Sequence, residues 1–259
     1  MPPKTVLITG CSEGGIGDAL CKEFFRQGLR VFATARNTAK MENLKALGIE
    51  TIPLDVVDKA SVSEAVEAVQ VATGGGKGRW TTLSTTRGYS MPLLDANIDV
   101  ARDMFDVNVF AVISAPWPFQ GFYNASKAVV NLLTDQLRVE LEPLHVKVIL
   151  VVTGTVRTQF FQNLPETRLP PGSVYAPAHE EVGYMLSGKR SQSAAMDVHD
   201  YARKVAQNVL KLRPTVNQWI GGSVSAVWAV STFLWHTAWL NPKGRYYIPA
   251  SQTEQAGQS

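Results

Sequence analysis

Tyr123 and Lys127 stand four residues apart in the stretch "GFYNASKAVVNLL", where apolar residues recur at helical spacing. On a helix, this spacing places both side chains on one face. A tyrosine hydroxyl with an ordinary pKa of about 10 is a poor acid or base at neutral pH, but a neighbouring ammonium stabilises the phenolate and lowers that pKa. The pair therefore has the residue types needed for proton transfer to or from a substrate.

A second stretch with chemical meaning is the glycine cluster "TGCSEGGIG", residues 9–17. It lies between an apolar run and an amphipathic one. In that context glycines let the backbone approach a pyrophosphate, and a helix N-terminus supplies N–H groups and a positive dipole. We therefore prefer a dinucleotide site over an ordinary strand–helix turn. The residues expected to contact the dinucleotide here are Gly10, Ser12, Gly15, Ile16 and Gly17.

The type of dinucleotide is indicated by "FATARN", at the end of the next apolar run. Folds that bind NAD usually carry an acid there, which binds the ribose 2′-hydroxyl. This chain has Thr34 and Arg36 in that place, with Lys40 soon after. Because a guanidinium and an ammonium suit a 2′-phosphate, the sequence predicts NADP(H) as the cofactor. The alternative is that Arg36 and Lys40 are solvated surface residues.

The elements that must position these residues alternate along the first third of the chain. Apolar runs predict strands over residues 5–10, 29–36 and 49–56. Amphipathic segments predict helices over residues 18–28, 38–48 and 61–72. This alternation predicts an α/β fold, with a single Rossmann-type doubly wound parallel sheet and helices on both faces.

The alternation fails after Thr73. Residues 74–92 should hold the fourth strand, yet they are rich in Gly, Thr, Ser, Lys and Arg and contain no apolar run. Helices are predicted over residues 97–113 and 121–144, and only seven residues, two of them prolines, separate them. Consecutive helices of a doubly wound sheet need a strand and two loops between them, so we expect the sheet to lack one or two central strands.

Composition narrows the class of protein. The chain has 259 residues and 45% apolar content, enough for one large α/β domain, and Lys plus Arg (25) nearly balances Asp plus Glu (22). We expect no nucleic-acid partner, because there is no basic run, and neither a metal site nor a signal peptide. Cys11 and Cys21 form no disulfide framework and fit a reduced compartment.

These motifs together resemble those of the short-chain dehydrogenase/reductases, over about residues 4–212. The resemblance rests on "ITGCSEGGIG", "FATARN", "MFDVNVFAV", "GFYNASKA" and "VKVILVVTGTVRT", and it is strongest to the fungal branch of acyldihydroxyacetone-phosphate reductases. It implies an NADPH-dependent carbonyl reductase that transfers a hydride to a ketone, with an apolar or acylated small molecule as the substrate.

The resemblance also implies roles for the catalytic residues. Tyr123 would donate a proton to the carbonyl oxygen, and Lys127 would lower the tyrosine pKa and bind the nicotinamide ribose. Asn108, in "DVNVF", would position a proton-relay water. The family's serine normally lies about a dozen residues before the tyrosine, a count that falls inside the helix predicted over 97–113 here. Ser114, nine residues upstream of the tyrosine, is therefore the candidate.

Further cofactor contacts follow from the same resemblance. Asp55, in "LDV", would lie beside the adenine together with Val56. In "TGTVRT", Val156 and Thr158 would contact the nicotinamide amide, and Thr153 replaces the usual proline, a departure that loosens the turn.

Two family motifs are missing. "LSTTRG" stands where the fourth strand normally ends in N-N-A-G, and the strand of the catalytic serine has no counterpart. Our hypothesis is that residues 80–87 are a frame-shifted stretch, because the neighbouring reading frame permits Leu-Asp-Tyr-Ser-Ile-Asn-Asn-Ala-Gly. A deletion or misplaced splice at Ile113/Ser114 would explain the second loss.

Three functions stay open on these residues. The first is reduction of a lipid-type ketone such as 1-acyldihydroxyacetone phosphate, and the second is a ketoreductase of fungal secondary metabolism. The third is a catalytically inactive or truncated member of the family. The substrate segment, residues 159–195, is rich in Phe, Pro, Leu and Tyr and does not separate them. A homo-oligomer is a further expectation.

Residues 215–241 contain no Asp, Glu, Lys or Arg and hold four of the six tryptophans. Three interpretations are open: a buried strand and helix, shallow association with a membrane or lipid surface, or a membrane span. We divide the chain into a dinucleotide-binding domain (1–212), an apolar segment (213–242) and a tail expected to be disordered (243–259). The expected location is the cytosolic face of the endoplasmic reticulum or a lipid droplet, and otherwise the cytoplasm.

Overall fold

The computed structural model describes residues 4–74, 80–83, 121–159, 169, 171–173, 175–187 and 194–233. The strands are β1 (Thr5–Thr9), β2 (Arg30–Ala35), β3 (Glu50–Pro53), β4 (Trp80–Leu83), β5 (Leu150–Thr153) and β6 (Asn217–Ile220). The α-helices are α1 (Ile16–Arg26), α2 (Glu42–Ala46), α3 (Lys59–Ala72), α5 (Gly121–Leu141), α6 (His179–Leu186), α8 (Val198–Val209) and α9 (Val224–Phe233). Three 3-10 turns are η1 (Thr38–Met41), η3 (Glu142–Leu144) and η5 (Ala176–Ala178).

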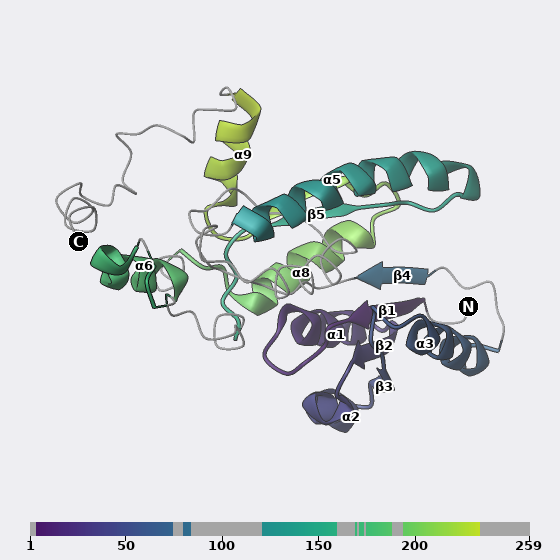
Figure 1. Ribbon diagram of the computed structural model, residues 1–259. Helices are drawn as coiled ribbons and strands as arrows, with labels where there is room; N and C mark the ends of the chain where they lie inside the picture. The colour runs from purple at the N-terminus through teal and green to yellow at the C-terminus, as the bar shows by residue number, and fades with distance from the viewer. Residues whose placement is uncertain are drawn as a thin grey trace.

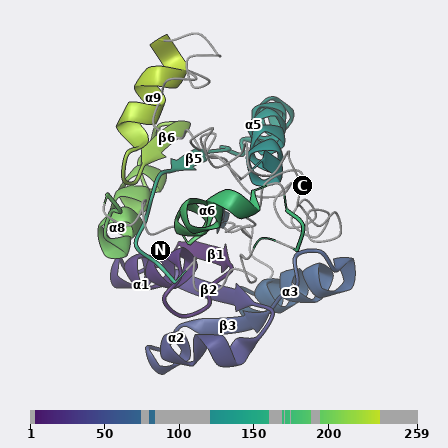
Figure 2. The ribbon, with the colours of Figure 1, turned by 60° about the vertical axis from the view of Figure 1, so that its left-hand side comes forward.

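The strands form two parallel sheets. The first has the order β3-β2-β1-β4, and the second pairs β5 with β6. Helices α1 and α8 cover one side and α3 and α5 the other (Figures 1 and 2). This arrangement confirms the doubly wound α/β fold, with the first three strands and helices where the sequence predicted them.

The fourth strand is present, although the sequence indicated none. Backbone pairing places Thr5 opposite Trp80 and Ile8 opposite Leu83, so β4 runs parallel to β1. The expectation failed because it required an apolar run, whereas "WTTL" consists mostly of aromatic and β-branched residues, which favour strands without being strongly apolar. In the described part of the chain no strand lies between β4 and β5, and the described strands form two separate sheets.

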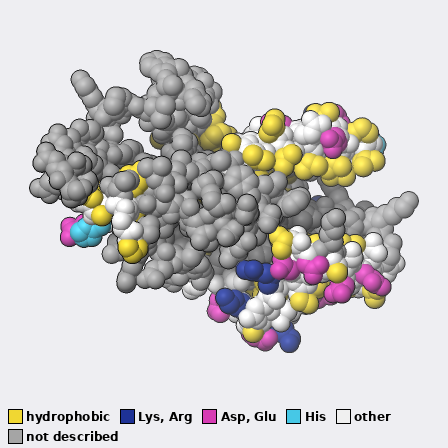
Figure 3. Space-filling view, in the orientation of Figure 1, with side chains coloured by type: hydrophobic (Ala, Val, Ile, Leu, Met, Phe, Trp, Pro, Cys, Tyr) yellow, Lys and Arg dark blue, Asp and Glu magenta, His cyan; other side chains and the backbone are white. Residues whose placement is uncertain are grey.

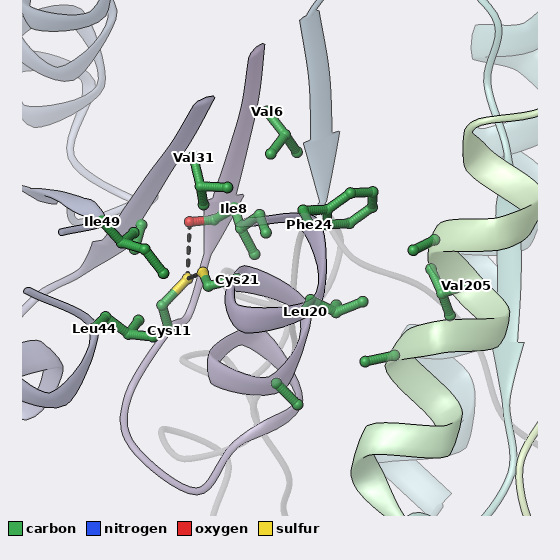
Figure 4. Packing of buried hydrophobic residues seen from close by; sticks show 14 of the residues in the cluster. Val6, Ile8, Cys11, Leu20, Cys21, Phe24, Val31, Leu44, Ile49 and Val205 are labelled. Carbon is green, nitrogen blue, oxygen red and sulfur yellow. Dashed lines mark hydrogen bonds between the residues drawn. The ribbon is translucent and has the colours of Figure 1, made fainter. Parts of the chain in front are cut away.

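The main core lies between the first sheet, α1 and α8 (Figure 4). Leu20 and Phe24 lie on the buried face of α1, and Val205 of α8 belongs to the same core. Full burial of each such side chain stabilises the fold by about 1.5–3 kcal/mol. Because α8 comes from the C-terminal half of the chain, this core joins both halves.

Cys11 and Cys21 lie side by side in this core as free thiols. The Cys21 thiol donates to Cys11 Sγ at 3.3 Å, and the Cys11 thiol donates to the carbonyl of Ile8 at 3.1 Å. The hydrogen bond to Cys11 and burial raise the pKa of Cys21 well above its usual range. The Cys21 thiol therefore stays protonated, and both side chains are packed in the core.

The apolar C-terminal stretch forms β6 and the start of α9 in its described part, which agrees with the interpretation as a strand and a helix. Gly221 and Gly222, between β6 and α9, pack against the backbone that follows β5. A Cβ on Gly154 would lie 2.4 Å from the carbonyl oxygen of Gly222, so the two backbone segments lie too close together for any residue other than glycine at this position. Among the described residues, no helix has both the length and the hydropathy of a membrane span. The rest of the stretch, and the tail 243–259, lie outside the described residues.

Candidate active site

The glycine turn after β1 has the backbone geometry of a phosphate-binding loop. Gly10 and Gly14 have φ of 71° and 72°, and a Cβ on Gly17 would lie 2.5 Å from the carbonyl oxygen of Gly10. Helix α1 begins after Gly15 without a side-chain cap. Its first N–H groups therefore point out of the helix without a capping side chain, the arrangement that suits a bound pyrophosphate.

A buried carboxylate stabilises this turn, and sequence reasoning missed it. Asp18, 5% exposed in the first turn of α1, accepts hydrogen bonds from the Gly14 N–H at 3.2 Å and from Lys22 Nζ at 2.8 Å. Its other oxygen accepts a bond from Asn43 Nδ2 at 2.8 Å. The available signal was an acid in the first helical turn, four residues before a lysine.

The cations after β2 lie next to the turn. The N–H of Glu13 donates to the carbonyl of Lys40 at 2.9 Å, which holds η1 against the glycine loop. Arg36 and Lys40 are both exposed, and neither makes an ion pair with the described part of the chain. Thr34 is different, because its side chain is fully buried and its Oγ1 donates to the carbonyl of Ile8. The side chain of Thr34 therefore connects β2 to β1, and its contact with the cofactor stays a prediction.

Asp55 follows β3, the strand beside β2. Its Oδ1 accepts the N–H of Val57 at 3.2 Å, and its own N–H donates to Ser61 Oγ at 3.0 Å. Asp55 and Val56 are both half-buried. These bonds fix the loop at the carboxyl end of β3, where ligands of doubly wound sheets bind.

Tyr123 and Lys127 are brought together as the spacing predicted. Lys127 is fully buried, and its Nζ lies 5.3 Å from the centroid of the half-buried Tyr123 ring. Burial lowers the pKa of Lys127 to about 7. Next to it, Ser126 Oγ donates to the Tyr123 carbonyl at 2.8 Å. An ammonium that titrates near neutrality beside a phenol is typical of acid–base sites.

The loop after β5 reaches the glycine turn. The N–H of Gln159 approaches the carbonyl of Gly14 at 3.5 Å, and a Cβ on Gly14 would lie 2.8 Å from the Gln159 side chain. Val156 is 8% exposed and Thr158 is half-buried. The structure thus brings "TGTVRT" and "TGCSEGGIG" to the same end of the sheet.

Thr153, at the start of the turn after β5, has a partner on α8. Its hydroxyl and that of Tyr201, on α8, lie 2.6 Å apart in a hydrogen bond. Burial raises the pKa of Tyr201 to about 12, so its hydroxyl stays protonated and able to donate. The bond connects the end of β5 to the main core, to which Tyr201 belongs.

Two expected catalytic residues, Asn108 and Ser114, lie outside the described residues, as do residues 160–168 of the substrate segment. Where the chain is described, no three His, Cys, Asp or Glu side chains are grouped as a metal site.

Comparison with known proteins agrees with this geometry. The model of the short chain dehydrogenases matches residues 4–119 and 114–169, as two pieces that meet where the helix spacing predicted a missing strand. The chain is 35% identical over 237 residues to a short-chain dehydrogenase/reductase of Pestalotiopsis microspora, with 85% of each protein covered. It is 34% identical over 203 residues to the NADPH-dependent 1-acyldihydroxyacetone phosphate reductase of Schizosaccharomyces pombe, with 67% of this chain and 68% of that protein covered.

Solved structures support the same fold. A short-chain dehydrogenase of Streptomyces avermitilis superposes with a TM-score of 0.72 at 22% identity, over 87% of this chain and 91% of that one.

Proposed function

The chain belongs to the short-chain dehydrogenase family, and on that premise we propose that it is an NADP(H)-dependent oxidoreductase that reduces a ketone. The observation that carries the proposal is the exposed pair of cations, Arg36 and Lys40, that follows β2 beside a glycine turn with phosphate-binding geometry. No acid stands at the end of β2, where NAD-binding folds use one. The similarity to an NADPH-dependent reductase supports the same cofactor.

The glycine turn and the two cations would bind different parts of the cofactor. The uncapped start of α1 would hold the pyrophosphate, and Arg36 with Lys40 would bind the 2′-phosphate. When bound, NADPH supplies the hydride. The remaining proposed contacts are Gly10, Ser12, Ile16, Gly17, Asp55, Val56, Val156 and Thr158.

Tyr123 and Lys127 would carry the proton. In its charged form Lys127 favours the phenolate of Tyr123, so the phenol becomes a stronger acid toward a carbonyl oxygen that gains negative charge. Because the pKa of Lys127 is about 7, the charged form is available at neutral pH and below. The cation thus assists proton donation where the enzyme would work as a reductase.

We favour a lipid-type ketone such as 1-acyldihydroxyacetone phosphate as the substrate. The S. pombe relative is named for that substrate. A second candidate is an inactive member that binds NADP(H) without turnover, because the strand of the catalytic serine has no counterpart in the sequence.

The experiment is NADPH oxidation by the purified chain with 1-acyldihydroxyacetone phosphate, its unacylated parent and a polyketide-type ketone. Turnover of the acylated ketone alone supports the proposal, and a Tyr123→Phe variant should abolish it. Turnover of the polyketide-type ketone instead would identify a ketoreductase of fungal secondary metabolism. NADPH binding without turnover of any ketone would identify the inactive member.

We also propose that the chain associates peripherally with the cytosolic face of the endoplasmic reticulum or a lipid droplet. Helix α9 has only small polar residues among its apolar ones, and its Trp228 is 42% exposed. Tryptophan favours the boundary between lipid and water. An acylated substrate would be reached from such a surface.

The test of this location must leave β6 intact, because β6 pairs with β5 and belongs to the fold. Flotation of the full chain with liposomes of neutral phospholipid is compared with a Trp228→Ser variant. Loss of flotation in the variant supports the proposal. A full chain that stays unbound would favour a cytoplasmic protein.

A further inference from the structure

Three connections join the glycine turn to the segment that carries the proposed 2′-phosphate cations. Two are made by the backbone: the Cys11 N–H donates to the Thr34 carbonyl, and the Glu13 N–H donates to the Lys40 carbonyl. The third is made by side chains, because Asn43 of α2 donates to the same Asp18 carboxylate that accepts the Gly14 N–H. Among these three connections, the Asp18 side chain alone contacts both the glycine turn, at Gly14, and helix α2, at Asn43.

The burial of Asp18 makes this link specific. A carboxylate that is 5% exposed must have its oxygens paired, and here Gly14, Lys22 and Asn43 do so. Asn43 supports the same interpretation, because its Oδ1 is buried without a partner while its amide nitrogen points at Asp18. An unpaired buried carbonyl destabilises the protein. The bond to Asp18 is therefore the interaction that sets the orientation of this amide.

Helix α2 directly follows η1, which ends at Met41, and Lys40 lies in η1. Holding Asn43 thus holds the segment from Arg36 to α2 in one position relative to the glycine turn. NADH and NADPH share the pyrophosphate, but only NADPH has the 2′-phosphate that this segment would bind. A shift of the segment should therefore weaken NADPH more than NADH.

We propose that Asp18, through Asn43, is a positioning residue that sets the preference for NADPH over NADH. The inference rests on the cofactor assignment proposed above. It assigns cofactor choice to a side chain that need not touch the 2′-phosphate, in addition to the cations that would.

The experiment measures dissociation constants for NADPH and NADH by fluorescence, with thermal unfolding as a check on folding. Asn43→Asp sets two carboxylates against each other and should lower the preference for NADPH by about tenfold, the size of one hydrogen bond to a charged group. The exchanged pair Asp18→Asn with Asn43→Asp restores an amide–carboxylate bond and should recover most of the preference. Glu42→Ala, an exposed neighbour on α2, is the matched control and should leave it unchanged.

A second measurement needs no cofactor. Hydrogen exchange in the peptides over residues 10–18 and 36–44 should rise in Asn43→Asp and return toward the parent level in the exchanged pair. The inference is overturned if folded Asn43→Asp retains both the preference and the parental exchange, or if the exchanged pair recovers neither. Equal binding of both cofactors by the parent chain would instead refute the NADPH assignment, and hydrogen exchange would still decide whether Asp18 and Asn43 are coupled.

Discussion

Helices α1 and α5 are both amphipathic, and each carries or adjoins residues of the proposed site. They differ in how much of their apolar face is buried. On α1, Ala19, Leu20, Cys21 and Phe24 are buried against the first sheet and α8. On α5, the buried side chains that the structure describes are Ser126, Lys127, Val130 and Thr134, of which only one is apolar. The helix that carries the Tyr–Lys pair is held mainly through polar residues.

The apolar residues of α5 are instead exposed, as Figure 3 shows along the length of the helix. Leu132 is 73% exposed and Val139 is 67% exposed. Figures 1 and 2 place α5 over the side where the described strands separate into two sheets, between β4 and β5. Among the described residues, a helix with the apolar pattern of a buried element thus exposes much of its apolar face.

The largest loss of stability is expected from a substitution in the core around α1. Phe24→Ala should destabilise the chain by about 3–5 kcal/mol, because a fully buried ring is lost from a packed core. Urea unfolding measures this change. The exposed ring of Phe25 provides the matched control, and Phe25→Ala should cost much less. Equal losses would mean that the α1 core is not the more tightly packed region.

The buried lysine of α5 should make stability depend on pH. Its pKa falls from an ordinary 10.5 to about 7 on folding, so between these values the unfolded chain binds the extra proton. Stability should therefore rise by a few kcal/mol as the pH increases from about 7 to about 10.5. Unfolding curves across this range test it. Lys127→Met should remove the slope, and an unchanged slope in that variant would assign the titration to another group.

The bond between Thr153 and Tyr201 connects the second sheet to the core of the first. Tyr201→Phe should cost about 1 kcal/mol, because the Thr153 hydroxyl loses its partner while the ring still packs. Thermal unfolding measures the loss. The double variant Tyr201→Phe, Thr153→Val should cost less than the two single changes added together, and simple additivity would show that the hydroxyls are not coupled.

The smallest effect is expected on the exposed face of α5. Leu132→Ser should change stability by less than about 0.5 kcal/mol if the face is open to solvent. Sedimentation of both proteins, together with their unfolding curves, tests this. A loss above about 1 kcal/mol accompanied by a change in mass would show that a second copy covers α5, as the expected homo-oligomer would require.

The local patterns of the sequence predicted much of this architecture. The apolar runs of β1, β2 and β3, the glycine turn and the one-sided Tyr123–Lys127 pair depend on neighbours a few residues away. The strand β4 was missed because its formation depends on pairing with β1, far along the chain.

Long-range bonds explain the other misses. The bond between Thr153 and Tyr201 was not anticipated, because the two residues are 48 positions apart in the sequence. Asp18 was not singled out because Asn43, which donates a hydrogen bond to its carboxylate, is 25 residues away. Neither contact leaves a periodic signal that composition or spacing could reveal.

The pairing of β5 with β6 has a consequence for the order in which the chain folds during synthesis. Every described strand of the first sheet has been made once Leu83 has left the ribosome, whereas β5 must wait until Asn217 has been added. During that interval β5 has no partner strand, and α1 still lacks Val205 of α8. The nascent chain is therefore most exposed to aggregation and most dependent on chaperones between these two points.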